Sequence, residues 1–482
     1  MRGPAVVNSK TTRKNARILL QYIRSKSALL LGGVCAFIVA ALLRVNFTLP
    51  FLFILGGAYL TFIYKDRARK PYTLLNLSLL FVIIFVAGFA IIHIGWPIFY
   101  IPFCAVAMLA TMLFNELVVS LLLIVVASVS LALLANNDLF VGILFLSSGI
   151  LSSLLVLGAR RRNTIIRAGF IIGIMQALLW CAINHFSLAQ PQHYLLLFVN
   201  GIVCSVIVLG VLPIFEYLFK TITDVSLLEL ADFNQPLLNR MMLEAPGTYH
   251  HSLIVGNLSD AACKAIGANA LLARIGAYYH DVGKLQKPEY FSENQGISSK
   301  HDTLSASMSK LVIMNHVKEG VDIAKQYKLN ARLIDFIQFH HGDSLVYYFY
   351  RRALENLEED QEVKEEGFRY PGPKPNSKET AIVMLADSVE AAARALKDSS
   401  PSKIEEVVHK IVNNKFTDRQ LDQCELTLKD LEMISSVFIR ILNGIYHSRV
   451  NYPEPDAKNI LNLKKSAKDA SPQSQEDKKN SP

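Results

Sequence analysis

The sequence predicts an all-α protein in which a polytopic transmembrane domain precedes an all-helical domain outside the membrane. Hydrophobic residues make up 52% and charged residues 18% of the 482 residues, whereas ordinary globular domains carry about 25% charged residues. Charged residues are scarce between about Ser27 and Phe219 and frequent from Lys220 onward. After Thr221, apolar residues recur with a helical period, and no convincing alternation of apolar and polar residues predicts a strand.

Four regions are expected along the chain. The first, 1–26, is basic and contains no acid, which is typical of a topogenic segment. A secretory signal peptide is the rival interpretation, but another apolar span follows where a cleavage site should precede soluble chain. The later regions are a transmembrane domain at 27–219, a helical domain at 220–455 and a polar tail at 456–482 that is expected to be disordered.

The transmembrane domain is predicted from apolar stretches, because a spanning helix needs about 20 mainly apolar residues. The first two of these stretches are short and lie close together, so the expected number of spans is eight, with seven left open. Few ionisable residues lie at membrane depth, which favours anchoring or signal reception over transport. The stretches are 28–43, 49–64, 74–92, 98–114, 117–134, 139–157, 165–183 and 194–218.

The orientation follows from the basic residues in the loops. With eight spans, the amino-terminal segment and the basic clusters at 65–70 and 160–162 lie on one side of the membrane. Basic loops face the cytoplasm, so the carboxy-terminal helical domain is expected to be cytoplasmic as well. The net charge of +9 owes much to the opening segment and therefore does not indicate a nucleic acid polymer as partner.

Ten helices are predicted in the second domain. A long interruption at 358–377 is first acidic and then rich in glycine and proline. Such a loop is a mobile connector or, if it flanks a pocket, a flap. The predicted helices are 226–230, 236–245, 248–266, 268–279, 304–327, 331–341, 344–357, 378–396, 401–413 and 427–449.

Histidines and aspartates in this domain suggest a metal site. His280 and Asp281 follow a predicted helix that should end with Gly283 near its C′ position. Asp387 lies in a helix so apolar that it must be buried, and a buried carboxylate needs a metal, a buried arginine or a proton to offset its charge. Mixed histidine and carboxylate ligands favour a catalytic metal site with open positions over a closed structural site.

The order of these residues resembles the HD-domain metal-dependent phosphohydrolases. That series is His251, His280-Asp281 with Gly283-Lys284, His316, His340-His341 and Asp387. Further stretches resemble the seven-transmembrane HD type, the multi-span membrane HD-domain family that hydrolyses cyclic di-AMP. These stretches are GTYHHSL (247–253), GAYYHDVGK (276–284), ENQ (293–295), YPGPKP (370–375) and MLADSVE (384–390).

One departure from this family is clear in the membrane domain. The family commonly carries a large extracytoplasmic domain after the first span, whereas only 44–48 separate the first two predicted spans here. This difference argues against an external ligand-sensing role. It leaves the expected chemistry of the second domain unchanged.

The resemblance implies a site with two divalent ions, most often Mn or Fe. Asp281 would bridge the ions and act in catalysis together with Lys284, whose ammonium would offset charge on the phosphoryl oxygens; capping of helix carbonyls is an equal alternative for Lys284. His301 is a weaker candidate for a substrate contact, because the neighbouring Asp302 or Thr303 can simply cap the next helix. The implied ligands are His251, His280 and Asp387 for one ion and His316, His340 and His341 for the other.

The implied function is a multi-pass phosphodiesterase of the bacterial cytoplasmic membrane that hydrolyses cyclic di-AMP to linear 5′-pApA. Two alternatives stay open: an HD hydrolase of cyclic di-GMP or linear diadenylate, and a degenerate HD domain that acts as a nucleotide-binding membrane receptor. The sequence lacks the GYP tripeptide of the cyclic di-GMP class. Expected partners are the cyclic dinucleotide and the lipid bilayer, with a homodimer left open.

Overall fold

The computed structural model describes residues 73–186, 189–295, 300–355 and 363–446. These residues form α-helices and short 3-10 helices, and they contain no strand beyond one isolated bridge between Leu345 and Arg369. The predicted all-α fold is therefore confirmed. The basic segment 1–26, the first two predicted spans and the tail 456–482 lie outside the described residues.

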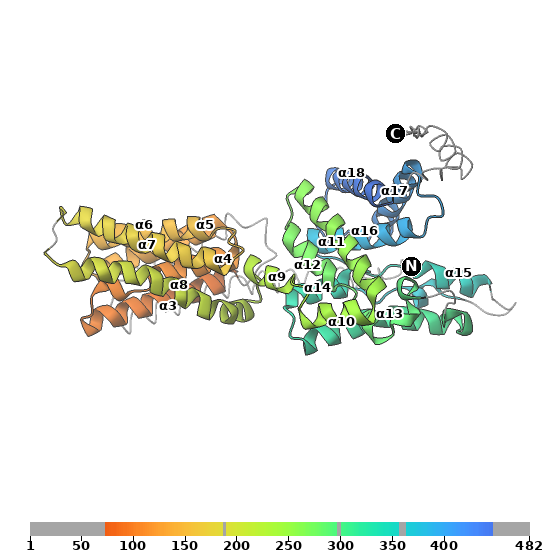
Figure 1. Ribbon diagram of the computed structural model, residues 1–482, viewed down its shortest axis with the longest axis horizontal. Coiled ribbons are helices and arrows are strands. Elements are labelled where there is room, and N and C mark those ends of the chain that lie inside the picture. Colours follow the sequence, from red (N-terminus) through yellow and green to blue (C-terminus); the bar gives the residue numbers. More distant parts are fainter. Residues whose placement is uncertain (1–72, 187–188, 296–299, 356–362, 447–482) are drawn as a thin grey trace, which may run out of the picture.

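The first part of the described chain is a bundle of apolar helices that lie side by side in Figure 1. Five of the described helices are long and apolar enough to cross a membrane. The shorter α4 (Phe103–Phe114) is buried along almost its whole length, and the 3-10 turn η2 (Ile98–Tyr100) separates it from α3. The five long helices are α3 (Thr73–Ile94), α5 (Leu117–Leu134), α6 (Leu139–Val156), α7 (Arg162–Ile183) and α8 (Pro191–Phe219).

A short helix, α9 (Asp224–Leu230), joins the bundle to the second domain. At the end of α8, the Glu216 carboxylate accepts hydrogen bonds from the Thr223 amide and the Ser226 hydroxyl, both at 2.7 Å. On the far side of α9, the Tyr279 hydroxyl donates to the Leu230 carbonyl at 2.7 Å. The helix that precedes the candidate site is therefore hydrogen-bonded to the connection from the membrane bundle.

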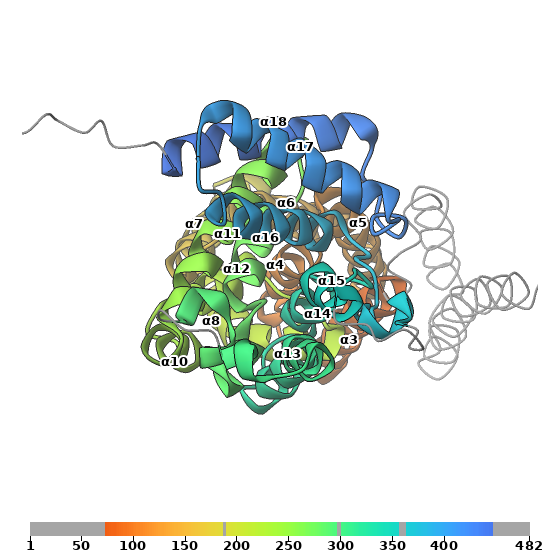
Figure 2. The same cartoon turned by 90° about the vertical axis from the view of Figure 1, so that its right-hand side faces the viewer.

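The second domain contains the ten predicted helices, with ends that differ from the prediction by a few residues. The central one is α16 (Lys378–Arg394), whose residues from Thr380 to Val389 are almost all buried. Figure 2 shows α17 and α18 covering one side of α16, and α11, α12 and α14 contact it as well. The others are α9, given above, and α10 (Pro236–Glu244), α11 (Pro246–Ile266), α12 (Ala270–Tyr279), α13 (Ala306–Gln326), α14 (Ala331–Phe339), α15 (Tyr347–Glu355), α17 (Pro401–Thr417) and α18 (Leu428–Ile445).

Candidate metal centre

Five segments of the second domain bring the seven predicted ligand residues to one place. Asp387 comes from the buried helix α16, His280 and Asp281 directly follow α12, and the histidine pair follows α14. The ligand atoms form two groups, and within each group all of them lie within 4.8 Å of one another. One group is His251, His280, Asp281 and Asp387, and the other is His316, His340 and His341.

Asp281 lies between the two groups with one carboxylate oxygen toward each. Its Oδ1 is 3.4 Å from His316 Nε2 and 3.5 Å from His340 Nε2. Its Oδ2 is 3.2 Å from His280 Nε2 and 3.6 Å from His251 Nε2. The arrangement is that of a carboxylate able to bridge two ions.

The polar atoms at this point are buried without hydrogen-bond partners. Within the described chain, both oxygens of Asp281 and Nε2 of His280 lack a properly aligned hydrogen bond, and apart from the histidines the only close cation is the Lys284 ammonium, 2.7 Å from Asp281 Oδ2. Burying such groups unsatisfied costs several kcal/mol for a charged carboxylate. Divalent metal ions would satisfy them, and imidazole with carboxylate is a donor set that such ions accept. The residues present therefore fit the two divalent ions that the family resemblance implies.

Asp387 contacts both groups from α16. Its Oδ1 is 3.1 Å from His251 Nε2 and 3.8 Å from His280 Nε2, and its Oδ2 is 3.7 Å from His341 Nδ1. Burial raises the pKa of Asp387, but hydrogen bonds to His251 and His280 outweigh it, and the pKa lies well below its ordinary value. The carboxyl is ionised and pairs with histidines, so neither a proton nor a buried arginine offsets its charge.

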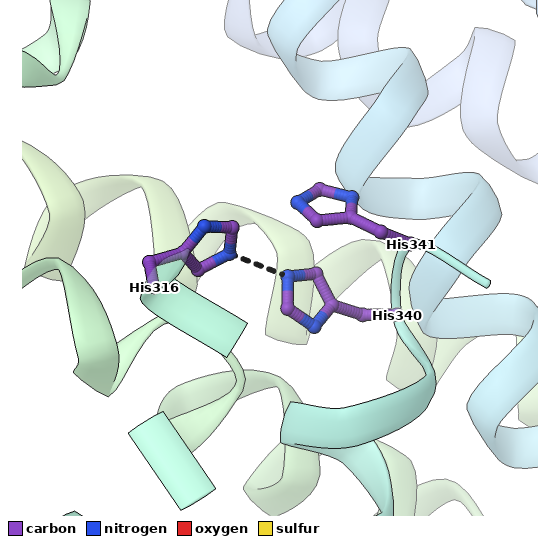
Figure 3. A group of neighbouring side chains, drawn as sticks. All are labelled: His316, His340 and His341. Carbon is purple, nitrogen blue, oxygen red and sulfur yellow. Dashed lines mark hydrogen bonds between the residues drawn. The ribbon is translucent and has the colours of Figure 1, made fainter. Parts of the chain in front are cut away.

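The ring orientations leave nitrogen lone pairs directed at the centre. His280 Nδ1 donates to the Ala277 carbonyl at 2.6 Å, His340 Nδ1 donates to the Ile337 carbonyl at 2.9 Å, and His316 Nδ1 donates to its own helix. A neutral imidazole that donates through Nδ1 keeps its lone pair on Nε2. In Figure 3 the Nε2 atoms of His316 and His340 face each other at 3.2 Å. Two lone pairs at this distance repel unless a proton or a metal ion lies beside them.

The protonation of the histidines differs between the groups in the metal-free chain. Burial lowers the pKa of His316 to about 4, although the negative charge of Asp281 acts in the opposite direction. Burial also lowers the pKa of His280, but the charge of Asp281 raises it by more, to about 10. His316 is therefore neutral and able to bind a cation at neutral pH, whereas a metal ion must displace a proton from His280.

Glu390 orients His251, and the sequence analysis did not identify it. Its carboxylate is hydrogen-bonded to His251 Nδ1, and its side chain is 1% exposed. The Tyr446 hydroxyl donates to the other oxygen of Glu390 at 3.2 Å. The spacing could have indicated it, because Glu390 lies three residues after Asp387 and so shares its helix face.

Lys284 reaches the centre from the turn after Asp281. Its Nζ is 2.7 Å from Asp281 Oδ2 and 2.6 Å from Glu293 Oε1, while the described structure shows no bond from it to a helix carbonyl. Burial lowers the pKa of Lys284, but Asp281 and Glu293 raise it by more, so the ammonium is charged. Glu293 also accepts from the Thr248 hydroxyl at 3.2 Å. Glu293 carried no role in the sequence analysis beyond its place in a family-like stretch.

Gly283 has a different role from the predicted one. The α-helix does end at Tyr279, but Gly283 lies inside the 3-10 helix η3 (Val282–Gln286) and lacks the positive φ of a C′ glycine. A Cβ at Gly283 would lie 1.8 Å from the His316 carbonyl oxygen. The residue is glycine because η3 packs backbone to backbone on α13, so the helix-stop prediction for it was wrong. Gly342, after the histidine pair, does have a positive φ of 57°.

His301 lies outside the two groups. It is 7% exposed, and its Nε2 is 2.8 Å from the Tyr290 carbonyl oxygen, with the Phe349 ring 5.0 Å away. Its contact with substrate stays a prediction. The alternative that Asp302 or Thr303 caps the next helix is wrong, because Ser305 is the N-cap of α13 and accepts from the Met308 amide at 3.2 Å.

Fold and site together define the class: a helical metal-site domain of the HD type attached to a multi-span membrane bundle. Residues 248–392 match the family model of the HD domain, and residues 41–223 match the model described as a 7TM receptor with intracellular HD hydrolase. The chain belongs to this family of multi-span membrane proteins with an HD domain.

Curated relatives of this type match most of the chain. The cyclic-di-AMP phosphodiesterase PgpH of Bacillus subtilis is 38% identical over 408 residues, which are 82% of this chain and 57% of that protein. The cyclic-di-AMP phosphodiesterase PgpH of Listeria monocytogenes is 38% identical over 426 residues, which are 84% of this chain and 58% of that protein. This chain thus spans less than two thirds of either relative. The crystal structure of the L. monocytogenes PgpH HD domain in complex with cyclic-di-AMP covers 45% of this chain and 100% of its own, at 43% identity and a TM-score of 0.43.

Proposed function

We propose that this chain is a membrane-anchored phosphodiesterase that hydrolyses cyclic di-AMP to linear 5′-pApA at a two-metal site. The observation that carries the proposal is Asp281, whose two carboxylate oxygens face two separate groups of buried ligand atoms. The substrate comes from the two PgpH relatives, which are named cyclic-di-AMP phosphodiesterases.

The ligand residues divide between the ions as the two groups do. His251, His280 and Asp387 would hold one ion and the three histidines of the other group the second, with Asp281 shared between them; Mn and Fe suit this donor set. When bound there, two divalent ions would supply water activation and would stabilise negative charge on the phosphodiester oxygens.

Residues of the chain then orient the reactants. The hydrogen bonds from histidine Nδ1 atoms to helix carbonyls hold the rings in place. The Lys284 ammonium, fixed between Asp281 and Glu293, offsets negative charge on the phosphoryl oxygens. Burial of the centre strengthens these interactions, because little water screens them.

The second domain faces the cytoplasm in this proposal. Arg160 and Arg162, beside the start of α7, pair with Asp224 at 3.6 Å and Glu229 at 2.7 Å on the connecting helix α9. The basic end of the bundle is thus the end from which the second domain continues, and basic loops face the cytoplasm. The proposal keeps the domain bounds expected from the sequence, which are 1–26, 27–219, 220–455 and 456–482.

The test is turnover by the full chain in detergent. The purified protein is loaded with Mn²⁺ or Fe²⁺, supplied with cyclic di-AMP, cyclic di-GMP or 5′-pApA, and the products are separated by chromatography. Release of 5′-pApA, with cyclic di-AMP preferred in competition, is the expected result. Metal-loaded protein that binds cyclic di-AMP without cleaving it would instead be a nucleotide receptor, and preference for another dinucleotide would move the proposal to that substrate.

A further inference from the structure

Tyr370 lies against the centre although it belongs to none of the ligand-bearing segments. Its ring stacks on His341, with centroids 4.4 Å apart and planes at 29°. The same ring meets His316 edge-on at 6.3 Å. Tyr370 is 8% exposed and is the first residue of the YPGPKP stretch (370–375). The proposed function assigns no role to this stretch.

Backbone pairing holds Tyr370 in this position. The Tyr370 amide donates to the Ser344 carbonyl at 3.0 Å, and the Val346 amide donates to the Phe368 carbonyl at 2.9 Å. Between them, Leu345 and Arg369 form the isolated antiparallel bridge. The segment that carries Tyr370 is therefore paired with the segment that leads away from the histidine pair.

The neighbouring Arg369 anchors the segment from the other side. Its guanidinium donates to the Asp418 carboxylate at 2.9 and 3.1 Å, to Glu365 at 2.7 and 2.9 Å and to the Asp343 carbonyl at 3.0 Å. Asp418 follows α17, so the anchor lies outside the metal-binding helices. A side chain held this firmly is preorganised and loses little entropy when a ligand binds.

The Tyr370 hydroxyl makes no hydrogen bond with the described residues, and its oxygen is not among the fully buried atoms that lack a partner, so a ligand can reach it. The phenol is near the centre, because its ring stacks on His341 and meets His316 edge-on. A tyrosine hydroxyl can donate a hydrogen bond. Unprotonated phosphoryl oxygens only accept hydrogen bonds, so the hydroxyl and such an oxygen are complementary.

We propose that Tyr370 is a substrate-contacting residue whose hydroxyl donates a hydrogen bond to a phosphoryl oxygen bound at the centre. Lys284 contacts Asp281 on the side of His251 and His280, whereas Tyr370 lies over the other histidine group. The two donors thus serve different sides of one phosphodiester. This inference rests on the proposed function for the identity of the substrate.

The test compares Tyr370→Phe with Tyr350→Phe in the metal-loaded full chain. Phenylalanine keeps the stacking on His341 and removes only the hydroxyl. Tyr350 on α15 packs on Phe368 at 5.7 Å, away from the ligands, and so controls for the loss of a hydroxyl. Three quantities are measured: metal content, kcat and KM for cyclic di-AMP, and the affinity for inorganic phosphate by calorimetry.

Tyr370→Phe is expected to keep its metal and to lose about 10- to 100-fold in kcat, as for a hydrogen bond to a charged group. Its affinity for inorganic phosphate should fall several-fold, while Tyr350→Phe stays at the wild-type values. Wild-type kcat and phosphate affinity in Tyr370→Phe would overturn the inference, and so would loss of metal, which would show a role in the centre itself.

Failure of the proposed function gives a different pattern. If the wild-type protein cleaves no cyclic dinucleotide, the function is wrong, and the phosphate titration alone decides on Tyr370. Weaker phosphate binding by Tyr370→Phe would then still support the contact, and equal binding would overturn it.

Discussion

Gly283 lies so close to His316 that a Cβ added to it would be 1.8 Å from the carbonyl oxygen of His316. The same Cβ would lie 2.6 Å from the amide nitrogen of Gly320, one turn further along α13. This backbone contact brings the segment after α12 directly onto the helix that carries His316. As a result, Asp281 reaches within 3.4 Å of His316 Nε2, and the two ligand groups meet.

Gly283→Ala should therefore damage the centre without removing a ligand. The added methyl group meets backbone, which cannot rotate away, so η3 must move off α13. Overpacking of this kind costs about 1–3 kcal/mol or more. We expect a melting temperature several degrees lower and reduced metal content, measured on the full chain in detergent by thermal unfolding and elemental analysis.

Gly444→Ala is the matched control for this substitution. Gly444 lies in α18 with no atom within 4 Å of an added Cβ. Alanine is a better helix former than glycine by roughly 1 kcal/mol, so the melting temperature should stay or rise. Wild-type stability and metal content in Gly283→Ala would contradict the close contact.

Asp281→Asn should remove more metal than the loss of any single histidine, because both groups use this carboxylate. Asparagine keeps the shape but loses the charge that offsets two cations. We expect neither ion to be retained in full and turnover to fall by more than the roughly 10- to 100-fold typical for residues that only support a ligand. Asp322→Asn on the exposed face of α13 is the control. Stoichiometric binding of two ions by Asp281→Asn would refute the bridging role.

Much of this arrangement could be predicted from the chain itself. The helices of the second domain follow from the apolar period and from local capping residues, such as Thr427 before α18. Asp387 was recognisable because it is the one acid in the apolar run from Ala381 to Val389, and a buried acid needs a partner. Both signals are local, so they can be recognised in the sequence without knowing how the helices pack.

The remaining features depend on contacts between distant segments. Gly283 looked like a helix stop, since the sequence does not show that α13 packs on it. Glu293 contacts Lys284 only because a 3-10 turn brings the chain back to the centre. Tyr370 contacts His341 because the isolated bridge between Leu345 and Arg369 positions the long loop that carries it. The N-cap of α13 is Ser305 and not Asp302, so the helix begins less than one turn later than predicted.

Glu390→Gln should weaken metal binding through His251. The carboxylate holds the ring by its Nδ1 and makes its Nε2 more basic; an amide can hold the ring but carries no charge. Loss of such a partner typically costs about 10- to 100-fold in metal affinity. The measurement is competition with a chelator of known affinity, with the exposed Glu432→Gln as control. Unchanged metal affinity in Glu390→Gln would show that Glu390 only fills space.

Glu293 should make the metal-free fold sensitive to acid. Burial raises the pKa of this carboxyl, but Lys284 lowers it by more, to about 2, from 4.5. A group with a lowered folded pKa stabilises the fold only while it is ionised. Its contribution, at most about 3 kcal/mol, is therefore complete above pH 4.5 and is lost as the pH falls toward 2.

The comparison that isolates this effect is wild type against Glu293→Gln after removal of metal with EDTA. The variant should melt at a lower temperature at pH 7, and the difference should shrink steadily between pH 4.5 and pH 3, because protonation removes from the wild type the charge that the variant already lacks. A difference that is the same at pH 7 and pH 3 would mean that Glu293 acts through its shape and its bond to Thr248. It would also mean that the charge on Lys284 is offset by Asp281 alone.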